Sequence, residues 1–102
     1  MPITMSSPDL GDVERQAVDH VLHTPTLSIG PQIEAFEQAL AAYTGNRHAA
    51  GVNSGTSGLH LCIIAAGVGE GDLVITTPFS FVASANCILY ERAIPIFVDV
   101  DP

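Results

Sequence analysis

The sequence contains no lysine and no tryptophan, and its three strongly basic residues are Arg15, Arg47 and Arg92. Eleven acidic residues give a formal net charge of −8. A chain with so few cations lacks the basic surface that binds nucleic acid or an anionic membrane, so we expect neither partner. The missing lysine also removes the side-chain amine that forms Schiff bases with carbonyl compounds.

Cysteine and long apolar runs are scarce too. Cys62 and Cys87 each fall within a predicted apolar helix, where a free thiol behaves as a small core residue, and two cysteines form no secreted disulfide framework. The first residues show no signal-peptide pattern, and the longest apolar run, 61–68, is shorter than the ~20 residues of a membrane span. We expect a soluble, cytoplasmic protein of at most one domain.

Apolar spacing and turn residues predict two helices followed by strands that alternate with helices. The predicted elements are helix 8–23, helix 31–44, strand 48–52, helix 59–66, strand 73–76, helix 81–91 and strand 94–98. Pro31 and Gly45 suit the two ends of the second helix, and Ser80 is placed to cap the last helix. Such alternation predicts the α/β class, with helix–helix followed by βαβαβ and a parallel, helix-covered sheet.

The turn around residues 54–57 has the character of an anion site. The first N–H groups of a helix have no intrahelical partner and form the positive end of its dipole. Gly55 permits close approach of a ligand, and Thr56 and Ser57 add hydroxyl groups, so a phosphate would fit. The spacing matches neither a Walker loop nor a dinucleotide-binding motif. The alternative is an ordinary capped helix start without a ligand.

A second turn, 77–81, also leads from a strand into a helix. In parallel α/β sheets all turns of this kind lie at the carboxyl edge of the sheet, where ligands bind. We therefore expect Phe81 to face the same side as Thr56. The alternative for Phe81 is a buried core aromatic residue.

Two small groups of possible metal ligands occur. His20 and His23 lie three residues apart beside Asp19, and Asp99 and Asp101 alternate at the end of the last predicted strand. Two histidines without further ligands are usually surface residues, and we interpret the two aspartates as the polar end of a strand. We therefore predict no metal site.

Taken in order, the motifs resemble the opening portion of the DegT/DnrJ/EryC1/StrS family of sugar aminotransferases, which are pyridoxal 5'-phosphate enzymes of the aspartate aminotransferase fold. The stretches that carry the resemblance are Ile29-Gly30-Pro31, Phe36-Glu37, Asn53-Ser54-Gly55-Thr56-Ser57-Gly58, Gly67-Val68-Gly69-Glu70-Gly71-Asp72, Val74-Ile75-Thr76-Thr77-Pro78, Phe81-Val82-Ala83-Ser84-Ala85-Asn86 and Phe97-Val98-Asp99-Val100-Asp101-Pro102. The resemblance implies that residues 1–102 are an N-terminal fragment of the cofactor-binding large domain, a three-layer structure with a mostly parallel sheet.

The resemblance also implies roles for individual residues. Gly55, Thr56 and Ser57 would hold the cofactor phosphate, and Phe81 would stack on the pyridine ring. The complete enzyme would be a homodimer that transfers an amino group from glutamate or glutamine to a keto-sugar nucleotide in amino-sugar biosynthesis.

The family's Schiff-base lysine and the acid that pairs with the pyridine nitrogen lie further along the chain than residue 102. We therefore assign no catalytic residue here and expect residues 1–102 to be inactive alone. Two alternatives remain: a dehydratase of the same family, with histidine in place of the lysine, and a non-catalytic relic or interaction module. The family fold places later strands beside the early ones, so we also expect unpaired strand edges and exposed apolar surface.

Overall fold

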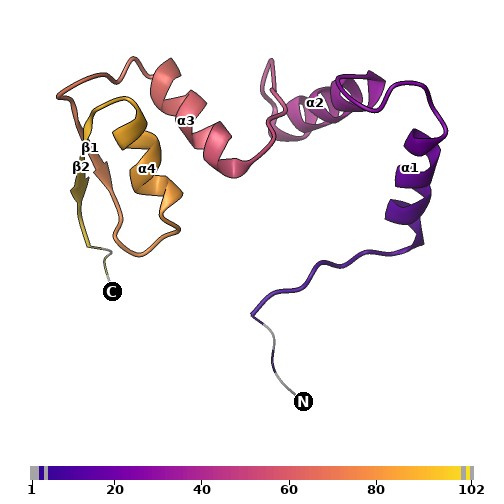
Figure 1. Cartoon of the computed structure of the whole chain (residues 1–102), viewed down its shortest axis with the longest axis horizontal. Helices are drawn as coiled ribbons and strands as arrows, with labels where there is room; N and C mark the ends of the chain where they lie inside the picture. Colours follow the sequence, from indigo (N-terminus) through magenta and orange to yellow (C-terminus); the bar gives the residue numbers. More distant parts are fainter. Residues whose placement is uncertain (1–2, 4, 100, 102) are drawn as a thin grey trace. The chain divides into compact units, whose positions relative to one another are not determined.

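The computed structural model describes residues 3, 5–99 and 101 and divides into two compact units, 1–51 and 52–102 (Figure 1). The first unit contains α1 (Asp12–Leu22) and α2 (Pro31–Thr44). The second contains α3 (Gly55–Ala65), β1 (Leu73–Thr76), α4 (Ala83–Tyr90) and β2 (Ile94–Phe97). The α/β class and the order of these six elements match the prediction.

In the first unit, individual residues at the helix ends determine where the helices begin and end. Pro31 occupies the first turn of α2, where its missing N–H is not needed. Gly45 ends α2 in the left-handed conformation, with φ of 69°, as predicted. Helix α1 begins at Asp12, later than expected, and the Glu14 carboxylate accepts a hydrogen bond from the Gly11 N–H at 2.7 Å.

The strand predicted over 48–52 is wrong, because the described strands β1 and β2 pair only with each other. A strand exists only where a neighbouring chain segment supplies N–H and C=O partners. The Gly51 N–H instead donates to Glu37 Oε1 at 2.7 Å, so a side chain from α2 fixes this segment. A Cβ on Gly51 would lie 2.8 Å from Ile33 Cδ1, which explains the glycine at this close approach.

The second unit is built on the parallel pairing of β1 with β2, in which Leu73 lies opposite Ile94 and Thr76 opposite Phe97. Helix α4 connects the two strands and packs on them (Figure 1). Cys87, Ile88 and Ala93 form the buried core, and Ile63, Val68 and Val74 pack against it. These residues come from α3, α4, β1 and the turns after the two helices, and they join those elements into one unit.

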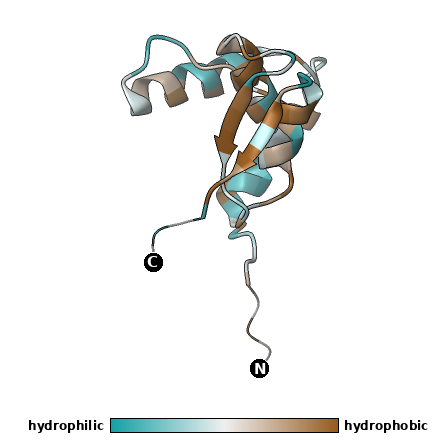
Figure 2. Cartoon of the chain, turned by 90° about the vertical axis from the view of Figure 1, so that its left-hand side faces the viewer, coloured by the Kyte–Doolittle hydropathy of each residue, from teal (hydrophilic) through white to brown (hydrophobic). Residues whose placement is uncertain are grey.

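Apolar surface remains open on the strands, which are mostly brown in Figure 2. Leu73 is 68% exposed and Ile75 is 74% exposed. This agrees with the expectation of unpaired apolar surface. Cys62 is exposed, so its predicted place in the core is wrong, whereas Cys87 is buried as expected. On α3 it is Ile63, and not Cys62, that packs against the core.

Helices α3 and α4 end in the same hydrogen-bond pattern. After α3, the N–H groups of Gly67 and Val68 donate to the carbonyls of Ile64 and Ile63, at 2.9 and 3.3 Å. This Schellman motif confirms the predicted helix end and αβ turn, and Gly67 supplies the positive φ of 75° that it requires.

After α4, the corresponding N–H groups belong to Arg92 and Ala93, at 2.9 and 3.3 Å from the carbonyls of Leu89 and Ile88. Arg92 therefore adopts a φ of 57°, which is strained for a residue with a Cβ atom.

We predict that Arg92→Gly raises the free energy of unfolding by about 0.5–1 kcal/mol, because glycine takes positive φ without a Cβ clash. Urea denaturation of the full chain measures the change. Arg92→Ala is the matched control, because it keeps the Cβ atom at this φ and, like Arg92→Gly, removes the ion pair with Glu70. The side chains of Arg92 and Glu70 are 77% and 70% exposed. A glycine variant no more stable than the alanine variant would contradict the prediction.

Candidate functional site

The start of α3 is held by a small network of side chains. Ser54 is the N-cap residue, and its hydroxyl accepts a hydrogen bond from the Ser57 N–H at 3.1 Å. The Ser57 hydroxyl in turn donates to Asn53 Oδ1 at 2.7 Å. As the first two residues of the helix, Gly55 and Thr56 have N–H groups without an intrahelical acceptor. The network thus orders the turn and leaves these two donors for a ligand.

A cavity of about 400 Å³ lies between the starts of α3 and α4. The residues that line it are Gly55, Thr56 and Leu59 from α3, and Ser80, Phe81, Ala83 and Ser84 at the start of α4. The prediction that Thr56 and Phe81 face the same space is therefore confirmed. Their binding of a cofactor stays a prediction.

Phe81 is 75% exposed, so the alternative of a buried core aromatic residue is wrong. The backbone explains its position at the mouth of α4. The carbonyls of Phe81 and Val82 accept hydrogen bonds from Ser84 and Ala85, at 3.0 and 3.1 Å, and begin the helix just after the ring. The ring is thus placed by the first turn of a helix and not by core packing.

Two hydroxyl groups on the cavity wall were not predicted as site residues. Ser80 is not the helix cap that we expected, because α4 begins after Val82 with no side-chain cap. The Ser80 hydroxyl lies 2.9 Å from the Ser84 hydroxyl. Their spacing of four residues at a helix start is the signal that could have identified the pair.

Ser57 is not among the residues that line the cavity, since its N–H and hydroxyl both contact the cap network. The lining also contains no charged side chain. Helix N–H groups and hydroxyls are therefore the polar groups that the wall offers, and no carboxylate opposes an anion there. This arrangement suits a phosphate group and a flat apolar ring held side by side.

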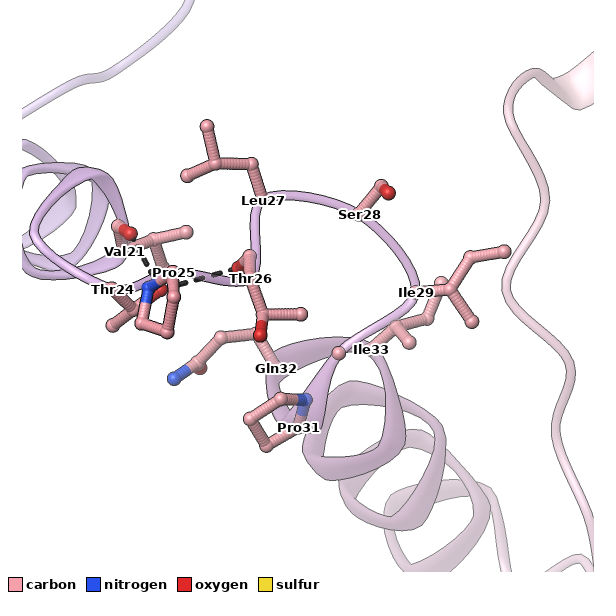
Figure 3. A pocket seen from close by; sticks show the side chains of 11 residues that line it. Val21, Thr24, Pro25, Thr26, Leu27, Ser28, Ile29, Pro31, Gln32 and Ile33 are labelled. Atoms are coloured by element: carbon pink, nitrogen blue, oxygen red, sulfur yellow. Dashed lines mark hydrogen bonds between the residues drawn. The ribbon is translucent and has the colours of Figure 1, made fainter.

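Another cavity, of about 430 Å³, lies in the first unit and is lined by Val21 and residues 24–33 (Figure 3). The Thr24 hydroxyl donates to the Val21 carbonyl at 2.8 Å and contacts the Thr26 carbonyl at 3.2 Å, as the dashed lines show (Figure 3). No acidic, basic or histidine side chain lines this cavity. It therefore offers no group for acid–base chemistry, and the cavity at α3 and α4 is the better candidate.

The possible metal ligands are dispersed. His23 Nδ1 lies 2.8 Å from the backbone carbonyl of Asp19 and 3.7 Å from its carboxylate, on an exposed part of α1. Over residues 3, 5–99 and 101, no three His, Cys, Asp or Glu side chains are grouped to hold a metal ion. Within the same residues, no helix has the length and apolar character to span a membrane.

Solved aminotransferase structures resemble this chain. A putative sugar aminotransferase of Streptococcus pneumoniae, Spr1654, was solved in its PLP form and superposes with a TM-score of 0.90 at 31% identity, over 97% of this chain and 25% of its own. Helicobacter pylori PseC, an aminotransferase involved in the biosynthesis of pseudoaminic acid, gives a TM-score of 0.89 at 35% identity, over 96% of this chain and 27% of its own. The chain thus has the α/β fold of these aminotransferases.

Sequence comparison defines the family. The spore coat polysaccharide biosynthesis protein SpsC of Bacillus subtilis is 44% identical over 96 residues, which cover 94% of this chain and 25% of SpsC. The profile of the DegT/DnrJ/EryC1/StrS aminotransferase family matches residues 8–102. The chain belongs to this family and spans about a quarter of the length of the relatives that it matches.

We predict that Ser54→Ala lowers the free energy of unfolding by about 1 kcal/mol, because it removes the N-cap acceptor of α3. Ser54→Asp is the matched control, since a carboxylate also caps a helix and complements its dipole. Chemical denaturation of the full chain compares the two variants. Equal stability of the alanine variant and the wild type would show that the cap does not hold the turn.

Proposed function

We propose that residues 1–102 form the N-terminal part of the pyridoxal-phosphate-binding large domain of a sugar aminotransferase. The observation that carries the proposal is the cavity shared by Thr56, at a helix start, and Phe81, an exposed aromatic ring. Spr1654, which matches over 97% of this chain, was solved in PLP and PMP forms. The residues present here suit such a cofactor, because they combine anion donors with a ring-sized apolar wall.

In this proposal Gly55 and Thr56 hold the cofactor phosphate directly, and Ser57 supports them. Gly55 and Thr56 line the cavity at the first turn of α3, where the helix dipole favours negative charge. Ser57 acts through the turn that it orders with Asn53 and Ser54. A phosphate at this point is held by dipoles and hydroxyls without a cation in the lining.

Phe81 orients the cofactor ring by stacking against one face of it. The bound cofactor supplies the electron sink that amino-group transfer requires. The apolar face of Phe81 excludes water from that side of the ring and fixes its plane relative to the phosphate. Residues 1–102 therefore bind and orient the cofactor, and the base for proton transfer comes from outside these residues.

The amine that links to the cofactor comes from outside residues 1–102, since these residues include no lysine. The proposed substrates of the whole protein are a keto-sugar nucleotide and glutamate or glutamine, and the proposed assembly is a cytoplasmic homodimer. Support for a sugar substrate comes from the relatives, which include a polysaccharide biosynthesis protein and an aminotransferase of pseudoaminic acid biosynthesis.

We predict that Thr56→Val weakens binding of pyridoxal phosphate to the full chain about tenfold, because a hydrogen bond to a charged group is lost. Fluorescence titration with the cofactor measures the dissociation constant. Thr44→Val is the matched control: the Thr44 hydroxyl bonds to the Leu40 carbonyl within α2, and its loss leaves the cavity unchanged. Equal affinity of the Thr56 variant and the wild type would remove Thr56 from the site.

Phe81→Leu tests the aromatic contact separately from apolar bulk. We expect a roughly two- to tenfold rise in the dissociation constant of pyridoxal phosphate, because leucine retains an apolar wall and loses ring stacking. The visible absorption and circular dichroism of the bound cofactor should change in the same variant. Phe79→Leu, on a neighbouring ring that does not line the cavity, is the control. Matching spectra for Phe81→Leu and the wild type would refute stacking.

A further inference from the structure

A polar contact links the second turn of α3 to the carboxyl end of α4. His60 Nε2 lies 2.6 Å from Glu91 Oε1, and the two side chains are only 33% and 29% exposed. Because a carboxylate only accepts hydrogen bonds, the Nε2 atom carries the proton and donates it. The His60 ring also meets the Tyr90 ring edge-on, with centroids 5.1 Å apart and planes at 67°.

The His60–Glu91 contact joins the same two helices that line the cavity. His60 follows Thr56 by four residues, so both lie on one face of α3, one turn apart. Glu91 directly follows the last residue of α4, whereas Phe81 precedes the first. The amino ends of α3 and α4 thus both line the cavity. The His60–Glu91 contact joins the same two helices at a second point, nearer to their carboxyl ends.

Helix α3 depends on α4 for its position. Among the described elements of the second unit, α3 packs against α4 and makes no comparable contact with β1 or β2. Its largest contribution to the core is the apolar side chain of Ile63. Apolar packing is non-directional and tolerates sliding, whereas a short hydrogen bond between fixed atoms selects one register.

We propose that His60 and Glu91 are positioning residues that set the register of α3 against α4 and thereby hold Thr56 opposite Phe81. This inference rests on the proposed function, since the geometry that it preserves is that of the cofactor site. Without the pair, α3 slides along α4, the Thr56 hydroxyl is displaced from the cofactor phosphate, and the affinity falls because that hydrogen bond is weakened or lost.

The experiment measures the dissociation constant of pyridoxal phosphate for His60→Ala and Glu91→Ala in the full chain. We expect a rise of about tenfold for each, the size expected for loss of a hydrogen bond to a charged group. The double variant His60→Glu with Glu91→His restores the pair in reverse and should recover most of the affinity. The control is Glu70→Ala, which removes the exposed pair with Arg92, 3.2 Å apart, and should leave the affinity unchanged.

A double-mutant cycle separates positioning from a general loss of stability. If His60 places Thr56, then Thr56→Val costs less affinity in the His60→Ala background than in the wild type, because the hydroxyl is already displaced. Additive losses would overturn the positioning role. If His60→Ala does not fold, as judged by circular dichroism, Glu91→Gln tests the positioning role in its place. Glutamine preserves the shape of the Glu91 side chain but not its charge, so we expect it to weaken cofactor binding by less than about tenfold.

The outcomes distinguish failure of this positioning role from failure of the proposed cofactor binding. A wild-type chain that does not bind pyridoxal phosphate overturns both. Wild-type binding that Thr56→Val weakens and His60→Ala leaves unchanged overturns the positioning role alone. Failure of the reversed pair to recover affinity, with both variants folded, also counts against it.

Discussion

The parallel pairing of β1 with β2 is the constraint on which the site depends. Two parallel neighbours must be joined by a crossover, and α4 supplies it, so α4 begins beside the carboxyl end of β1. Phe81 lies in the turn that this geometry creates. Helix α3 then packs on α4 and brings its own amino end to the same cavity. One strand pairing and one helix contact therefore place both walls of the site.

The chemistry of the cavity follows from what its walls contain. Its lining is neutral in a chain of net charge −8, so the many carboxylates are kept away from the place where an anion would bind. Helix amides and hydroxyls are fixed dipoles that need little rearrangement to receive a phosphate. In our proposal these residues bind and orient the cofactor, and the amine comes from another part of the protein, since residues 1–102 include no lysine.

The open apolar surface shows how far the structure relies on other contacts. Leu73 and Ile75 leave much of β1 exposed, and residues 48–52 have no strand partner within the described chain. The matched relatives are about four times as long. An edge strand with exposed apolar side chains is a ready template for pairing with another strand. In our proposal, the residues that line the cavity therefore form one side of a larger binding site.

Local chemistry alone determined the bounds of α2 and β1 and the glycines that follow α2 and α3. These features depend on φ preferences and on hydrophobic spacing. The shared cavity of Thr56 and Phe81 was instead predicted from a strand at 48–52 that the described residues do not form, and the packing of α3 on α4 produces it. The missing strand at 48–52, the exposure of Cys62 and the His60–Glu91 contact became known only from the folded chain. Each of them depends on which segment packs alongside, and His60 and Glu91 are 31 residues apart in sequence. No local pattern encodes such a partner.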